Sequence, residues 1–85
     1  MKKHFASPVF WECYKKLPPY IQDFADSSFE TLKRNPKHPS LHLKKVGKYW
    51  SVRVGRKYRS LAVEINEGLV WFWIGTHAEY DKWIK

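Results

Sequence analysis

Apolar positions recur with a helical period in the first part of the chain and with a period of two after residue 40. Within residues 7–20, "SPVFWECYKKLPPY", four side chains share one face of a helix: Phe10, Cys13, Tyr14 and Leu17. Ser7 is a suitable N-cap, Pro8 suits the first turn, and Pro18 stops the helix. The pattern predicts a short first helix.

A second helix is predicted over about residues 19–34, because the same period continues there. Pro19 can begin it and "NPKHPS" breaks it. Its apolar face is formed by Ile21, Phe24, Ala25, Ser28, Phe29 and Leu32. Two helices joined by Pro-Pro form a helical hairpin.

The second half of the chain predicts a meander of about four antiparallel strands. The stretches are "LHLKKV" (41–46), "YWSVRV" (49–54), "YRSLAVEI" (58–65) and "LVWFWIG" (69–75). Residues 55–57 and 66–68 suit hairpin turns, and the last strand is apolar on both parities, as expected for a central strand. With a short C-terminal helix, and a possible edge strand at residues 2–5, the fold class is α+β, a helical hairpin packed on the sheet.

Length and composition are typical of one small domain spanning residues 1–85. Aromatic residues make up 18% of the chain, which suits a compact core of large side chains. A single cysteine, Cys13, excludes an intrachain disulfide and a four-cysteine zinc site, and lies on the apolar face of the first helix. We find no signal peptide or membrane span, so the cytoplasm is the expected location.

The formal net charge of +8 points to phosphate-rich partners or an acidic protein. No acidic residue lies between Glu30 and Glu64. That window carries the basic residues Lys33, Arg34, Lys37, Lys44, Lys45, Lys48, Arg53, Arg56, Lys57 and Arg59. Strand residues are interleaved with them, so we expect a basic surface on folded β structure, the alternative being a merely solvated face.

Strand alternation places Arg53 opposite Val52 and Val54, on the open face of the sheet together with Ser51. Lys44 shares the polar parity of its own strand. Arg59 is less clear, because it shares parity with Leu61, although a bulge or twist at the strand start could turn it. Clustered arginines bind phosphate and stabilise negative charge on it; the alternative is simple solvent exposure.

His77 is the obvious titratable group, since an imidazole suits proton transfer near neutral pH. A lone histidine after a strand is more often structural or exposed. Tyr80 and Asp81 would lie on the same side of a helical turn, where Tyr80 could stack on a base or donate a proton and Asp81 could orient the imidazole. Thr76 and Glu79 fit a capping box, so we assign both to architecture.

Metal binding is not expected. His38 and His42 are four residues apart, but Pro39 lies between them and no helix is predicted there. No glycine-rich phosphate loop, nucleophile elbow or Cys–His signature is present. The sequence therefore predicts no metal and no small-molecule cofactor.

Three stretches carry a family resemblance: "FWECYKKLPPYIQDFADSSFETLKRNPKHPSLHLKKV", "WSVRVGRKYRSLAVE" and "VWFWIGTHAEYDKWI". Together they cover essentially the whole chain, and the "GTHAEYD" ending and the "VRVG…YR" hairpin are the specific parts. They resemble the RelE/ParE superfamily of type II toxins, in particular its HigB-like and YafQ-like ribosome-dependent ribonucleases. The chain departs from the superfamily in having no long N-terminal strand.

The resemblance implies a metal-independent endoribonuclease that cuts mRNA in the ribosomal A site, through attack of the RNA's own 2′-hydroxyl on the adjacent phosphate. It implies His77 as general acid or base, Arg53 and Arg59 as phosphate-binding residues, and Tyr80 and Asp81 as supporting or base-contacting residues. The residues implied in docking on RNA or the ribosome are Lys44, Lys45, Lys48, Arg56 and Lys57. The implied partners are the ribosome, mRNA and a cognate antitoxin.

Two other functions stay open at this point. The superfamily contains ParE-type members that inhibit DNA gyrase and lack this catalytic set; the presence of His77, Arg53 and Arg59 argues against that branch. A catalytically inactive RNA-binding module is the second alternative, because a basic folded surface alone is enough to bind RNA.

Overall fold

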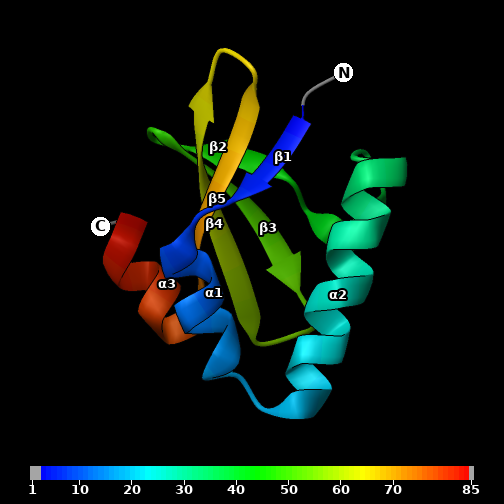
Figure 1. The fold of residues 1–85 in the computed structure, drawn as a ribbon, viewed down its shortest axis with the longest axis vertical. Helices are drawn as coiled ribbons and strands as arrows, with labels where there is room; N and C mark the ends of the chain where they lie inside the picture. The colour runs from blue at the N-terminus through cyan, green and yellow to red at the C-terminus, as the bar shows by residue number, and fades with distance from the viewer. Residues whose placement is uncertain (1–2, 85) are drawn as a thin grey trace.

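A five-stranded sheet forms the middle of the molecule in a computed structural model, which describes residues 3–84 (Figure 1). The strand order is β1-β5-β4-β3-β2, with β1 parallel to β5 and all other pairs antiparallel. The elements are β1 (Lys3–Ala6), α1 (Pro8–Lys15), α2 (Pro19–Arg34), the 3-10 turn η1 (Pro39–Leu41), β2 (Lys44–Val46), β3 (Tyr49–Val54), β4 (Tyr58–Ile65), β5 (Gly68–Thr76) and α3 (His77–Ile84).

The predicted α+β class, the order of the elements and both hairpin turns are confirmed. The strand number is corrected from about four to five, and the sheet is mixed, because β1 pairs with β5 in parallel. The edge strand predicted at residues 2–5 is β1, although its residue 2 lies outside the described residues.

The strand predicted over residues 41–46 is wrong in its first half, and only Lys44–Val46 forms β2. Leu41 closes the 3-10 turn that begins at Pro39, and its side chain is buried. His42 then adopts a left-handed backbone with φ 47°, which no strand residue adopts. The alternation in this stretch therefore reflects a turn that buries one leucine.

The two N-terminal helices begin where the sequence predicts. The Ser7 hydroxyl caps α1 by accepting from the Phe10 N–H at 3.3 Å. The helices are tied together by the Tyr14 hydroxyl, which donates to Asp26 Oδ1 at 2.7 Å. This hydrogen bond is the main cause that raises the pKa of Tyr14 to about 12. Within residues 3–84, no helix is long and apolar enough to cross a membrane.

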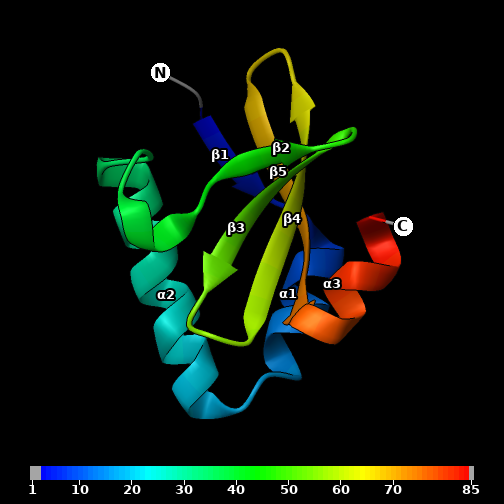
Figure 2. The same cartoon turned by 180° about the vertical axis from the view of Figure 1, so that it is seen from behind.

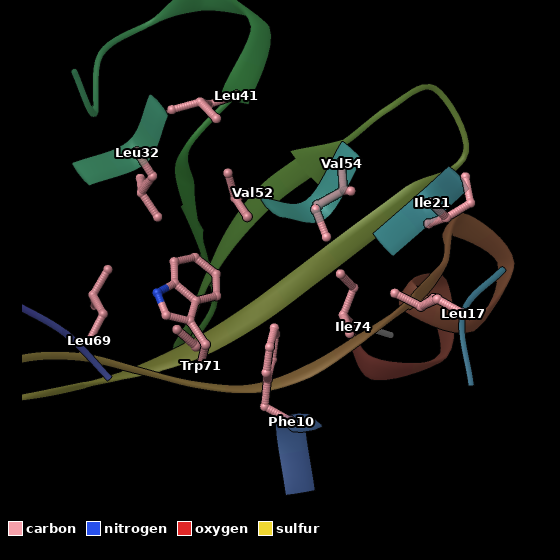
Figure 3. Close-up of a cluster of buried hydrophobic side chains, with 12 residues drawn as sticks. Phe10, Leu17, Ile21, Leu32, Leu41, Val52, Val54, Leu69, Trp71 and Ile74 are labelled. Atoms are coloured by element: carbon pink, nitrogen blue, oxygen red, sulfur yellow. The ribbon is translucent and has the colours of Figure 1, made fainter. Parts of the chain in front are cut away.

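The larger core lies between the sheet and the pair α1 and α2 (Figure 3). Trp71 of β5 lies in the middle of this core and is 2% exposed. Its ring meets that of Phe29 of α2 in an edge-to-face contact, with 5.3 Å between the ring centroids. The indole N–H donates to His4 Nδ1 of β1 at 3.1 Å, so the largest side chain has no unsatisfied donor. The other buried members include Phe10, Leu17, Ile21, Ala25, Leu32, Leu41, Val52, Val54, Ala62, Leu69 and Ile74.

A second core lies on the opposite face of the sheet and is covered by α3. It contains Leu61, Trp73 and Tyr80. The register of β4 and β5 shifts here, since Leu61 pairs with Trp73 but Ala62 pairs with Trp71, which leaves Phe72 as an extra residue. This bulge turns Trp71 to the helical hairpin and Trp73 to α3. It explains why β5 is apolar on both parities.

Candidate functional site

The candidate residues gather at the end of the sheet where β5 passes into α3. Arg53 of β3 and Arg59 of β4 are direct partners in the register, and Arg59 in turn pairs with Gly75 of β5. His77 begins α3 two residues later. Figure 2 shows the β3–β4 hairpin loop and the start of α3 at this same end of the sheet. The topology thus brings together residues that lie up to 28 positions apart, from Arg53 to Asp81.

A capping box fixes the start of α3, as predicted. The Glu79 N–H donates to Thr76 Oγ1 at 3.2 Å, and Glu79 Oε1 accepts from both the Thr76 N–H and its hydroxyl at 3.0 Å. The hydrogen bonds from Thr76, first the backbone and then the side chain, lower the pKa of Glu79. Glu79 is therefore occupied as a helix cap.

His77 has a fixed backbone and an open side chain. Its N–H donates to the Lys57 carbonyl of the β3–β4 loop at 2.8 Å, which docks that loop on the first turn of α3. Its imidazole is 53% exposed, and Nδ1 lies 3.6 Å from Asp81 Oδ2, an ion-pair distance longer than a hydrogen bond. The two side chains therefore lie close together, as the spacing predicts.

Tyr80 lies beneath His77 and Arg59. Its ring centroid is 5.5 Å from that of His77 and 5.2 Å from Arg59 Cζ, a cation–π contact. Tyr80 is only 4% exposed, so the expectation that it stacks on a base is corrected. Its ring is a buried platform, because the first turn of α3 packs it into the second core with Leu61 and Trp73.

Arg59 lies on the same face as Arg53, which sequence parity left unclear. Arg59 shares parity with Leu61, and Leu61 belongs to the core under α3 rather than to the core under the helical hairpin. Arg59 Nη1 is buried and has no hydrogen-bond partner among residues 3–84. Buried guanidinium donors are normally paired, so this N–H group stands out as an unsatisfied donor.

Arg53 lies in the second half of β3, beyond the residues that pair with β2. Its Nε donates to the Gly55 carbonyl at 2.9 Å, and Nη1 lies 3.5 Å from His42 Nε2. The two arginines therefore share a backbone pairing but differ in their side-chain partners. Ser51, expected on an open face beside Arg53, is instead fully buried. His42 is a neighbour that the sequence did not identify, since nothing in it predicts the left-handed turn.

The remaining cations are exposed on two sides of the sheet. Lys44 pairs with Ser51 and so shares its face, whereas Lys45 pairs with Trp50 and lies on the other. Lys48 is in the β2–β3 turn with Nζ 5.4 Å from the Tyr49 ring centroid. Arg56 and Lys57 are in the hairpin loop that docks on His77.

Comparison with known proteins assigns the family. Residues 19–82 match the profile of the ParE-like toxin domain. The chain belongs to the ParE-like toxin domain family. This confirms the resemblance to RelE/ParE superfamily toxins that was seen in the sequence. No curated protein matches the chain.

Solved structures share the fold of this ParE-like domain at low identity. A chain of the RelB–RelE antitoxin–toxin complex from Methanococcus jannaschii aligns with a TM-score of 0.72 and 15% identity, covering 95% of this chain and 99% of that one. YafQ from E. coli aligns with a TM-score of 0.68 and 15% identity, covering 94% of this chain and 98% of that one. A chain of the YoeB dimer from Staphylococcus aureus aligns with a TM-score of 0.66 and 15% identity, covering 89% of this chain and 97% of that one.

The ParE-like domain thus presents an exposed imidazole, a carboxylate beside it and an arginine donor over one aromatic ring. Such a set can accept a proton from a hydroxyl group and stabilise negative charge that develops on a phosphate. Within residues 3–84, no group of three or more His, Cys, Asp or Glu side chains is arranged to hold a metal ion.

Proposed function

We propose that this ParE-like domain is the toxin of a type II toxin–antitoxin system and acts as an endoribonuclease on translated mRNA. The observation that carries the proposal is that Arg59 and His77 both contact the buried ring of Tyr80, with Asp81 beside His77. Ring contacts hold the imidazole and the guanidinium on one small platform. An RNA phosphate placed there would meet a proton acceptor and a cation at once.

The reaction follows from the chemistry of RNA. Neutral His77 accepts the proton of the 2′-hydroxyl through Nε2 while the 2′-oxygen bonds to the phosphorus. The bond from phosphorus to the 5′-oxygen of the next nucleotide breaks, and this oxygen takes up a proton from the imidazolium. The products are a 2′,3′-cyclic phosphate and a 5′-hydroxyl end. Arg59 stabilises the charge on the phosphorane oxygens, and the Asp81 carboxylate, 3.6 Å from Nδ1, orients the imidazole of His77.

RNA and ribosome binding is assigned to the exposed cations around this site. Arg53 binds a phosphate next to the one that is cut, since it pairs with Arg59 in the register. The remaining cations would contact RNA backbone by charge without reading sequence, and they are Lys44, Lys45, Lys48, Arg56 and Lys57. The activity places the protein in the cytoplasm with the ribosomes.

A cognate antitoxin is proposed as the protein partner. Solved structures of the same fold include complexes whose names state a toxin with its antitoxin, among them RelBE2 from Mycobacterium tuberculosis and YoeB–YefM from Staphylococcus aureus. A net charge of +8 favours an acidic partner. Co-expression with the product of a neighbouring reading frame should give a complex that co-purifies and restores growth.

The test is to express wild type and His77→Ala in cells and to map the ends of translated messages. Removal of a general base costs about 10²- to 10⁴-fold in rate, so His77→Ala should abolish the new ends. His38→Asn is the matched control, because His38 is an exposed histidine at the N-cap of η1, where asparagine keeps a side-chain acceptor for the Ser40 N–H. If wild type makes no new ends, the nuclease proposal fails. If His77→Ala cuts like wild type, only the assignment of His77 fails.

Gyrase inhibition is the second candidate, and the match to the ParE-like family favours keeping it. It predicts intact mRNA and an accumulation of cleaved gyrase–DNA complexes in the same cells. An inactive RNA-binding module predicts neither effect, only RNA binding with a steep dependence on salt.

A further inference from the structure

A cleft of about 310 Å³ lies between α2, the turn η1 and the end of β3, and Arg53 is one of its lining residues. Four of its lining residues are hydroxyl side chains: Ser27, Ser28, Thr31 and Ser40. The others are Phe24, Arg53 and Gly55, so none of the described residues lining the cleft is acidic. Its volume is at the small end for ligand sites, which suits one nucleotide unit better than a helix.

Phe24 supplies an aromatic surface at the mouth of the cleft. The residue is 51% exposed although it lies on a helix that packs against the sheet. Its ring is 3.8 Å from the point where a Cβ on Gly55 would lie, so the ring rests against the start of the β3–β4 loop with its outer face open. An exposed phenylalanine ring of this kind is a stacking surface for an unpaired base.

Arg53 is held ready for an anion at the inner end. The bond from Nε to the Gly55 carbonyl fixes the plane of the guanidinium and uses one of its five N–H donors. His42, turned towards it by its left-handed backbone, lies 3.5 Å from Nη1. The terminal nitrogens can then bind a phosphate, while hydroxyl groups such as those of Ser27 and Ser28 can bind sugar or phosphate oxygens.

The cleft and the proposed cleavage site are linked along the chain by the β3–β4 hairpin loop. Gly55 lines the cleft, and Lys57, two residues later, accepts the hydrogen bond from the His77 N–H. Arg56 lies between them and is exposed. An RNA strand that passes from His77 towards α2 would therefore follow a short path with cations along it.

We propose that the cleft between α2 and β3 is a subsite for one unpaired nucleotide of the RNA strand next to the cleaved bond. Phe24 stacks on its base, Arg53 binds its phosphate, and the hydroxyl side chains of α2 bind its sugar. The inference rests on the proposed nuclease function and adds a recognition element to it. It requires a single-stranded substrate, because stacking on Phe24 needs an unstacked base.

Fluorescence anisotropy of a labelled short single-stranded RNA tests the subsite, with His77→Ala as the parent protein so that the probe stays intact. At constant low salt, adding Phe24→Ala should weaken binding roughly tenfold, since stacking accounts for about 5- to 150-fold per base when removed by alanine substitution. Phe24→Trp should bind as tightly as the parent. Tyr20→Ala is the matched control, because Tyr20 is an aromatic residue of α2 that is 64% exposed and does not line the cleft.

Phe24→Ala should bind a duplex RNA of the same sequence as tightly as the parent does. Equal unfolding midpoints for the variant and the parent would exclude misfolding. If Phe24→Ala binds single-stranded RNA as tightly as the parent, the subsite is refuted, while mapped mRNA ends still decide the nuclease proposal. Should the parent bind no free RNA, the ends made by wild type and by Phe24→Ala alone on translating ribosomes are compared. Equal cutting there also refutes the subsite, and no cutting by wild type removes both proposals.

Discussion

Gly75→Ala is expected to destabilise the protein by about 2 kcal/mol, because β5 has no room for a methyl group at this position. A Cβ there would lie 2.5 Å from Trp73 Cζ2 and 2.8 Å from Glu79 Oε1. Overpacking costs about 1–3 kcal/mol and a lost helix cap about 0.5–2 kcal/mol. The smaller entropy of an unfolded alanine chain returns about 0.4–1 kcal/mol. For a domain of this size the net loss lowers Tm by roughly 8–16 °C.

The loss of stability at Gly75 is expected from steric overlap alone, since the φ of Gly75 is not in the left-handed region. Gly47 is the matched control, because its φ is +61° and no atom lies within 4 Å of an added Cβ. Gly47→Ala should therefore cost about 1–2 kcal/mol through backbone strain alone, and Gly47→Asn should recover most of it, since asparagine tolerates this conformation. Gly75→Asn should be worse than Gly75→Ala.

The assay is urea unfolding followed by tryptophan fluorescence, with Tm from circular dichroism. Because the clash displaces Glu79 from the helix cap, Gly75→Ala should also loosen the first turn of α3 and reduce cleavage by the proposed nuclease. Glu79→Ala in the same chain should remove part of the Gly75→Ala penalty. If Gly75→Ala is as stable as wild type, or if Gly75 and Gly47 both respond to asparagine in the same way, the packing argument is refuted.

Three further changes have defined outcomes. Glu79→Gln should be less stable than wild type at neutral pH, and the gap should close on acidification in urea unfolding series. The lowered native pKa of Glu79 gives a contribution that is present above the ordinary value of 4.5 and lost as pH falls through the native value. The pKa of Tyr14 is raised to about 12, so Tyr14 stabilises the fold below its ordinary pKa of 10.0. This stabilisation is lost as pH rises towards 12. Asp26→Asn should therefore move one late tyrosine to a lower pH in an absorbance titration. Leu32→Ala should cost about 2–5 kcal/mol by urea unfolding, because Leu32 is fully buried, and a loss below 1 kcal/mol would show that the α2–sheet core is not packed as described.

The helices and most strands could be predicted because local signals and burial agree there. Ser7 and Pro8 start α1, and Ile21, Ala25 and Leu32 of the predicted apolar face of α2 are buried. Phe24 was predicted on the same face and is instead 51% exposed. The pairing of β1 with β5 could not be predicted, since it joins residues more than 60 positions apart and leaves no local pattern. The strand predicted at residues 41–43 was wrong because a turn that buries Leu41 gives the same alternating pattern as a strand.

The site could be predicted in its residue types better than in its geometry. The capping box and the spacing of His77 and Asp81 are local, so the sequence indicated both. The burial of Tyr80 depends on which face of the sheet α3 covers. The bulge at Phe72 turns Trp73 to that same face, and it has no sequence signature of its own.

The two cores explain why the candidate chemistry lies where it does. A sheet with both faces packed can expose functional side chains only at its edges and ends. Arg53 is near the end of β3, beyond its pairing with β2. His77 follows the end of β5, where the capping box and the Lys57 carbonyl hold its backbone and leave the imidazole open. The same packing buries Tyr80 and fixes the distance between His77 and Arg59. Rigidity and exposure therefore meet at this one corner of the molecule, which is the combination that catalysis on a large substrate such as RNA requires.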